Sequence, residues 1–309
     1  MSTTPERTES LTAAQAPFDD ARADLILQSS DGVHFRVFKV ILSLASPIFA
    51  DMFRIPSPTD ASLNHGDEGP VVRLSECSGD LDFSLRHLYP IRTPNAVPLR
   101  NVGVLAEFAR KYRINALTKH ITRYLADNIE FDPVGVYAIA VTYEFKDIWA
   151  KAARTCLDLP FSRLQSPLLH YIAVEFHVEL LRYHAACGEA ASGAASERNW
   201  FSSLNQDFDV ISMGNKAGCS HCITQDYLDH GPKFYGPLCL WNYLYRSTLV
   251  LVHHPSAKAV TTEEFVLKSN TCSSCADGMR RRMFDLSTAF GKEIKKVVER
   301  IPLPKAGTT

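Results

Sequence analysis

The sequence has no run of about 18 consecutive apolar residues, so we expect no transmembrane helix. It also lacks an excess of one charge, because 33 Lys and Arg stand against 34 Asp and Glu, a net charge of -1. This balance gives no global attraction to nucleic acid or to an anionic membrane. Residues 1–17 are polar and lack the apolar run of a signal peptide, and they predict a disordered leader. We therefore expect a nuclear or cytoplasmic protein.

The motifs of several large enzyme classes are also missing. The sequence has no nucleophile elbow, no phosphate-binding glycine loop, no dinucleotide-binding glycine pattern and no His-Glu-x-x-His. These absences favour a protein that is not an enzyme. The composition is that of a globular protein, with 46% hydrophobic and 22% charged residues, and 309 residues suggest about two domains.

Residues 24 to 128 predict short strands and helices in a mixed order. Asp31-Gly32 suits the turn of a β-hairpin, and Ser46-Pro47 suits the start of a second short helix after a first one. The predicted elements are strands 24–28 and 33–37, two helices within 40–53, strand 71–74 and helices 81–88, 102–112 and 117–125.

This order and its residues resemble a BTB/POZ domain over residues 22–128. The matching pieces are Asp24-Leu25-Ile26-Leu27, Phe35-x-Val37-Phe38-Lys39, Ile41-Leu42-x-x-Ala45-Ser46-x-x-Phe49-x-x-Met52-Phe53 and Leu105-x-x-Phe108-Ala109-x-x-Tyr112. The resemblance implies an α+β fold over residues 18–130, in which helical hairpins cap a small sheet. It also implies self-association, as a homodimer, or recruitment of a protein partner.

The resemblance points to two partner-binding residues, Asp24 and Lys39. Dimeric members of the family hold an acidic and a basic residue at these positions in a groove, where a partly buried ion pair would be costly to break. The alternative is an exposed Asp at a strand end and a Lys at a helix start, with little energy between them.

A different partner is disfavoured by the stretch after the helical hairpin. Family members that recruit a cullin-type ubiquitin ligase scaffold often carry an apolar-x-Glu element there. This chain has Phe53-Arg54-Ile55-Pro56-Ser57, without Glu. A cullin-type scaffold is therefore a doubtful partner.

The rest of the chain predicts mainly helices. Residues 131–187 predict a helical extension, starting at Asp132-Pro133 and including a long helix from Ser166-Pro167 to about Cys187. Residues 188–196 are small and polar and predict a helix end and a loop. Residues 188–309 form a cysteine-containing region with helices at 238–252 and 279–297.

Four of the eight cysteines form two Cys-x-x-Cys pairs, Cys219 with Cys222 and Cys272 with Cys275. In a reducing compartment such pairs are more often metal ligands than disulfides, and four thiolates suit a closed tetrahedral site. They predict one structural zinc ion, held across the 49 residues between the pairs. Unligated cysteines and a disulfide are the alternatives, and Cys187 is a possible substitute ligand.

This architecture resembles a group of BTB proteins from mushroom-forming fungi that have a cysteine-containing helical C-terminal region. We expect a non-catalytic interaction protein with a structural zinc site. The alternative is a nuclear transcriptional regulator whose last helix contacts DNA through Arg280-Arg281-Arg282, Lys292, Lys295 and Lys296. Glu293 and Glu299 dilute this positive charge, which makes a nucleic-acid partner unlikely.

Overall fold

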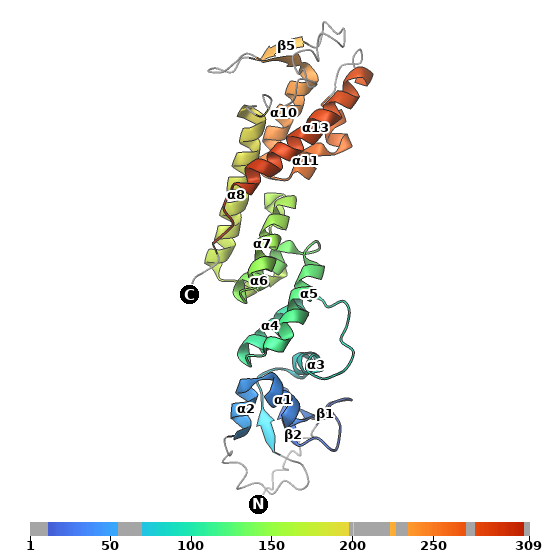
Figure 1. Ribbon diagram of the computed structural model, residues 1–309, viewed down its shortest axis with the longest axis vertical. Helices are drawn as coiled ribbons and strands as arrows, with labels where there is room; N and C mark the ends of the chain where they lie inside the picture. Colours follow the sequence, from blue (N-terminus) through green and yellow to red (C-terminus); the bar gives the residue numbers. More distant parts are fainter. Residues whose placement is uncertain are drawn as a thin grey trace, which may run out of the picture. The chain divides into compact units, whose positions relative to one another are not determined.

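The computed structural model describes residues 12–54, 70–197, 200, 223–226, 234–269 and 276–305 (Figure 1). The chain divides into two compact units, Met1–Asn128 and Ile129–Thr309. Within the described ranges, no helix has the length and apolar character needed to cross a membrane. The domain boundaries predicted from the sequence stay a prediction.

The first unit is a four-stranded sheet with helices, as the α+β prediction requires. Its strands lie in the order β1-β3-β2-β4, with β2 antiparallel to β3 and parallel to β4. The elements are β1 Thr12–Ala13, β2 Leu25–Gln28, β3 Val33–Val37, α1 Lys39–Ala45, α2 Pro47–Arg54, β4 Val71–Arg73, α3 Ser78–Arg86, α4 Leu99–Lys111, the 3-10 helix η2 Asn115–Leu117 and α5 Thr118–Asn128.

The predicted turn and helical hairpin are confirmed. Gly32 has φ +85° in the turn between β2 and β3, a conformation that favours glycine. Ser46 separates α1 from α2, and its Oγ accepts a hydrogen bond from the backbone N–H of Phe49 at 3.1 Å. The same hydroxyl donates to the carbonyl oxygen of Tyr112 at 2.5 Å, which joins the hairpin to the end of α4.

The prediction of a disordered leader over residues 1–17 is wrong for residues 12–17, while residues 1–11 lie outside the described ranges. Thr12 and Ala13 pair in parallel with β3, and the N–H of Ala14 donates to the carbonyl oxygen of His34. Phe18, which follows, is fully buried and packs edge-on against Tyr89. This burial anchors the polar segment before it, which composition alone did not reveal.

The second unit is mainly helical in its described part. Its elements are α6 Pro133–Thr142, α7 Lys146–Thr155, the 3-10 helices η3 Cys156–Asp158, η4 Phe161–Arg163 and η5 Pro167–Tyr171, α8 Val174–Glu197, β5 Ile223–Asp226, β6 Phe234–Pro237, α10 Leu238–Leu251, α11 Ala257–Thr261, α12 Glu263–Leu267 and α13 Ala276–Glu299. The predicted start of α6 is confirmed, because the Asp132 carboxylate accepts a hydrogen bond from the N–H of Gly135.

The predicted long helix from Ser166 to about Cys187 is wrong. Ser166 caps a single 3-10 segment, η5, and the next helix, α8, begins only at Val174. The carbonyl oxygen of Tyr171 accepts a hydrogen bond from Thr142 Oγ1 of α6 at 2.8 Å. A tertiary contact therefore occupies an acceptor that a continuous helix would use for its own backbone.

The predicted helix end and loop at residues 188–196 are also wrong, because α8 continues to Glu197. Alanine has the highest helix propensity, and this segment is rich in it. Small residues also allow close packing against α10, since a Cβ atom at Gly188 would lie 2.3 Å from the carbonyl oxygen of Val252. The small residues thus belong to a tight helix contact, not to a loop.

Candidate partner-binding surface

Helix α1 turns an apolar face to solvent. Val40 and Leu44 are 61% and 84% exposed, whereas Leu42, on the opposite side of the helix, is fully buried. Residues four apart lie on the same face of a helix, so Val40 and Leu44 form one surface. We call this pair the α1 face. An exposed apolar patch of this kind is typical of a surface that another molecule covers.

Two side chains from other elements hold the start of α1 in place. The N–H of Lys39 donates to a carboxylate oxygen of Asp24 at 2.8 Å, and the N–H of Phe38 donates to the hydroxyl of Tyr89 at 3.0 Å. The first N–H groups of a helix have no partner within the helix, so these bonds satisfy two donors at its start. They fix the orientation in which α1 presents its outer face.

The structure brings Asp24 and Lys39 together through the backbone of Lys39. Asp24 is exposed, and the described residues include no ion pair between the two side chains. The geometry is therefore that of a carboxylate that caps a helix, not of a buried carboxylate–ammonium pair. Their role in binding a partner stays a prediction.

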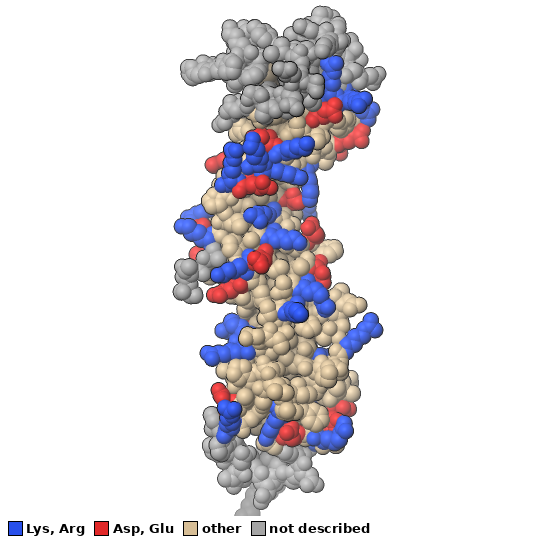
Figure 2. Space-filling view, viewed as in Figure 1, with Lys and Arg blue, Asp and Glu red and all other residues tan. Residues whose placement is uncertain are grey.

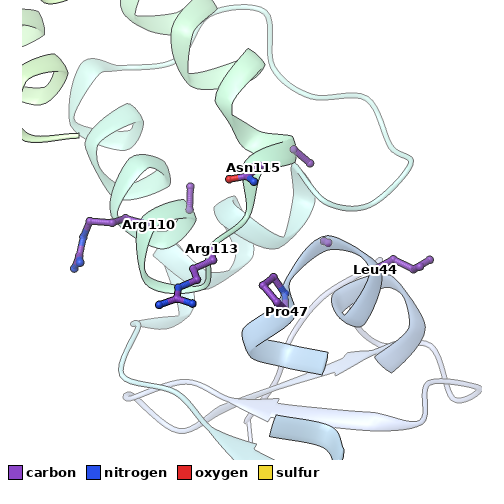
Figure 3. Close-up of a pocket in the computed structure, with 8 residues that line it drawn as sticks. Leu44, Pro47, Arg110, Arg113 and Asn115 are labelled. Atoms are coloured by element: carbon purple, nitrogen blue, oxygen red, sulfur yellow. The ribbon is translucent and has the colours of Figure 1, made fainter. Parts of the chain in front are cut away.

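Next to the α1 face lies a groove of about 630 Å³, between the α1–α2 junction and the end of α4 (Figure 3). Leu44, Ala45 and Pro47 line one side, and Ala109 and Ala116 line the other. These small and apolar side chains leave room for an incoming side chain and form no polar contacts with it. Because Leu44 belongs to both, the groove continues the α1 face.

Two arginines give the groove its charge. Arg110 is held by Glu107, with Nη2 2.6 Å from Oε1, and points away from Pro47 in Figure 3. Arg113 also lines the groove, is exposed, and makes no side-chain hydrogen bond or ion pair with any described residue. Its φ of 51° is uncommon for a residue with a Cβ atom and directs the chain from α4 into η2.

This chemistry suits recognition of a polypeptide. The groove is lined by apolar side chains, two guanidinium groups and the amide of Asn115, and its lining includes no carboxylate, thiol or imidazole. It therefore has no nucleophile and no general base with a pKa near neutrality. An apolar side chain with a nearby carboxylate would fit both its walls and its positive charge.

No sequence pattern predicts this groove, whereas the α1 face can be recognised in the sequence. Apolar residues from Val40 to Leu44 occupy too many positions to share one side of a single helix. At 3.6 residues per turn, Val40 and Leu44 lie nearly opposite Leu42, so a helical projection separates exposed from buried members. The groove depends on the left-handed conformation of Arg113, which no sequence pattern marks.

The proposed zinc ligands Cys219, Cys222, Cys272 and Cys275 all lie outside the described residues. Among the residues that are described, no group of three or more His, Cys, Asp or Glu side chains has the arrangement of a metal site. Cys187, the substitute ligand, is fully buried in α8, and burial raises the pKa of its thiol to about 11. A thiol that stays protonated is a poor zinc ligand.

Two of the basic residues of the last helix are paired with carboxylates. Arg280 pairs with Glu263 at 2.7 Å and Lys296 pairs with Glu293 at 3.1 Å. Figure 2 shows acidic and basic side chains interspersed over this unit. Four residues of the predicted apolar stripe of α13 are buried, Met283, Leu286, Phe290 and Ile294, so charged side chains occupy the solvated face. The charge pattern gives no support to DNA binding.

Comparison with known proteins yields one finding. The family described as BTB/POZ domain matches residues 16–129, which include the sheet, the α1 face and the groove. No curated protein matches the chain.

Proposed function

The chain is a BTB/POZ-domain protein, and from this premise we propose that it is a non-catalytic interaction protein that pairs with a second copy through the α1 face. A BTB/POZ domain binds other proteins. The observation that carries the more specific proposal is the exposure of Val40 and Leu44 on a helix whose start is fixed by Asp24 and Tyr89. Burying these side chains against a partner removes apolar area from water.

The groove supports the same proposal. Leu44 is common to the groove and the α1 face, so a partner that covers the face also reaches the groove. The positively charged guanidinium of Arg113 then lies at the edge of an apolar contact, which favours a partner segment that carries a carboxylate. The apolar-x-Glu element of cullin-binding family members is absent, so a cullin-type scaffold is not the partner that we propose.

Sedimentation of the full chain tests the α1 face. Leu44→Asp would bury an unpaired carboxylate in the interface, at a cost of at least about 3 kcal/mol, and should weaken pairing about 100-fold. Val174→Asp is the matched control, because Val174 is 76% exposed and lies in the second unit. If Leu44→Asp and Val174→Asp sediment alike, the α1 face is not the pairing surface.

We also propose that Cys219, Cys222, Cys272 and Cys275 hold one structural zinc ion. Two described elements support this, because β5 begins directly after Cys222 and α13 begins directly after Cys275. A shared ion would tie the starts of these elements together and supply folding energy to the segments before them.

Elemental analysis of protein purified without chelator should find one zinc ion per chain. Cys219→Ser or Cys275→Ser should abolish it, whereas Cys77→Ser, which changes an exposed free cysteine in the first unit, should leave it bound. The Cys219→Ser chain should also become sensitive to proteases in its second unit. Folded wild-type protein without metal contradicts the zinc site.

A further inference from the structure

Helix α10, in the second unit, carries another exposed apolar face. Leu238, Tyr245, Leu249 and Val252 are 38%, 67%, 57% and 40% exposed. They follow one another at intervals of seven, four and three residues, so at 3.6 residues per turn the first three fall on one side of α10, and Val252, directly after its last residue Leu251, continues that side. We call these four residues the α10 stripe.

The opposite side of α10 is buried within its own unit. Tyr243, Leu244 and Ser247 are buried, and the Tyr243 hydroxyl donates to the carbonyl oxygen of Val260 at 3.1 Å. The α10 stripe therefore does not belong to the core of this unit. Four apolar side chains along one helix face are more than the scattered exposed residues of an ordinary surface.

The α10 stripe is free of charge. Arg246 is the single charged residue of α10, and it donates to Ser269 Oγ at 3.0 Å and lies over the ring of Phe265. These contacts direct the guanidinium away from the stripe. Two identical stripes would meet without like-charge repulsion, whereas an acidic or basic partner would find nothing to pair with.

The two ends of the α10 stripe lie at equal spacing on either side of Tyr245. Leu238 lies seven residues before Tyr245, and Val252 lies seven residues after it. Leu249 lies four residues after Tyr245, and the position four before it is Trp241, which is half-buried and already has a contact within the chain. In an antiparallel helix pair with a twofold axis at Tyr245, Leu238 of one chain faces Val252 of the other.

We propose that the α10 stripe is a homotypic contact, in which a second copy of this chain packs its own α10 antiparallel to the first across Tyr245. A twofold interface requires one patch to complement itself, and the equal spacing of Leu238 and Val252 about Tyr245 meets this requirement at the centre and the two ends of the stripe. The contact is small, so it gains strength when another interface already holds two chains together. It lies in the second unit and shares no residue with the α1 face.

Two separate twofold contacts on one chain have a consequence for assembly. If both contacts form between the same two chains, the product is a closed dimer. If they form with different chains, the product is an open series of chains that grows with concentration. In either case Tyr245 lies beside its own counterpart.

Cysteine cross-linking of the full chain tests this geometry. Tyr245→Cys places two thiols at the twofold axis and should give a covalent dimer rapidly under mild oxidation. Leu238→Cys is the matched control, because in the antiparallel pair its counterpart lies 14 residues along the helix, roughly 21 Å away. Leu238→Cys alone should not exceed wild type, but Leu238→Cys together with Val252→Cys should cross-link.

Three results overturn the proposal. One is a Tyr245→Cys chain that cross-links no faster than wild type, and another is equal cross-linking at 238 and 245. The third is a monomeric wild-type chain whose free energy of unfolding falls with Tyr245→Lys. That result would mean that a segment of the same chain covers the α10 stripe.

The same experiment in a Leu44→Asp background separates this inference from the proposed function. Cross-linking of Tyr245→Cys that persists there supports the α10 contact without the α1 face. Cross-linking that needs Leu44 supports both contacts, acting together.

Discussion

In the first unit, buried polar groups join elements that are far apart in the sequence, whereas in the second unit helices approach closely over small residues. Ser46 reaches the carbonyl oxygen of Tyr112, and the Tyr124 hydroxyl reaches that of Pro94 at 2.8 Å. In the second unit Gly188 lies against the backbone at Val252. Hydrogen bonds between distant elements also occur in the second unit, as from Tyr243 to Val260, so the close backbone approach at Gly188 is the feature that distinguishes it.

The largest expected effect tests the packing of the second unit. Gly188→Ala places a Cβ atom 2.3 Å from a backbone oxygen, which cannot move without shifting α10. We expect the free energy of unfolding of the second unit to fall by about 3 kcal/mol, measured by denaturant unfolding with limited proteolysis. Gly79→Ala is the control, since its Cβ atom meets nothing within 4 Å. A Gly188→Ala chain as stable as wild type would disprove the close contact.

A smaller loss of stability is expected when one capping serine in each unit is replaced by alanine. Ser46 is fully buried and bonds both to Tyr112 and to the start of α2, so Ser46→Ala should cost about 2 kcal/mol. Ser166 is half-buried and bonds to Asp132 and Leu168, so Ser166→Ala should cost about 1 kcal/mol. Denaturant unfolding of both variants measures the difference. Equal or reversed losses would contradict the contrast between the units.

The smallest effect is a dependence on pH. Burial lowers the pKa of His184, whose ordinary value is 6.5 and whose Nε2 lies 3.0 Å from the carbonyl oxygen of Leu159. As pH falls below 6.5, the unfolded chain binds a proton that the folded chain does not, so stability falls. Above that pH the contribution is constant.

Replacing the imidazole tests this dependence. His184→Gln should flatten the fall in second-unit stability below pH 6.5, measured by unfolding at each pH. His170→Gln, at an exposed position, should leave the profile unchanged. An unaltered profile in His184→Gln would show that another group causes the pH dependence.

Local chemistry made much of the fold predictable from the sequence. The turn at Asp31-Gly32, the break at Ser46-Pro47 and the cap at Asp132 each depend on neighbouring residues, and the structure has all three. The order of these elements also carried the resemblance that the family match confirms. Caps and turns of this kind can be recognised in the sequence because they need no distant partner.

Features that depend on tertiary contacts were not predictable. A hydrogen bond from Thr142 of α6 accompanies the break before α8, and α8 packs closely at Gly188 against the backbone that follows α10. The same limit applies to the candidate site. Sequence pointed to Asp24 and Lys39, and a helical projection marks the exposed side of α1, whereas the groove appears only when the α1–α2 junction and the end of α4 are placed together.

We propose that the first unit binds another polypeptide, and the mass of the wild-type chain in solution is the decisive measurement. Light scattering at micromolar concentration should give at least two 34.5 kDa chains per particle, and Leu44→Asp should lower that value. A wild-type particle of one chain, at every concentration tested, would contradict pairing through the α1 face.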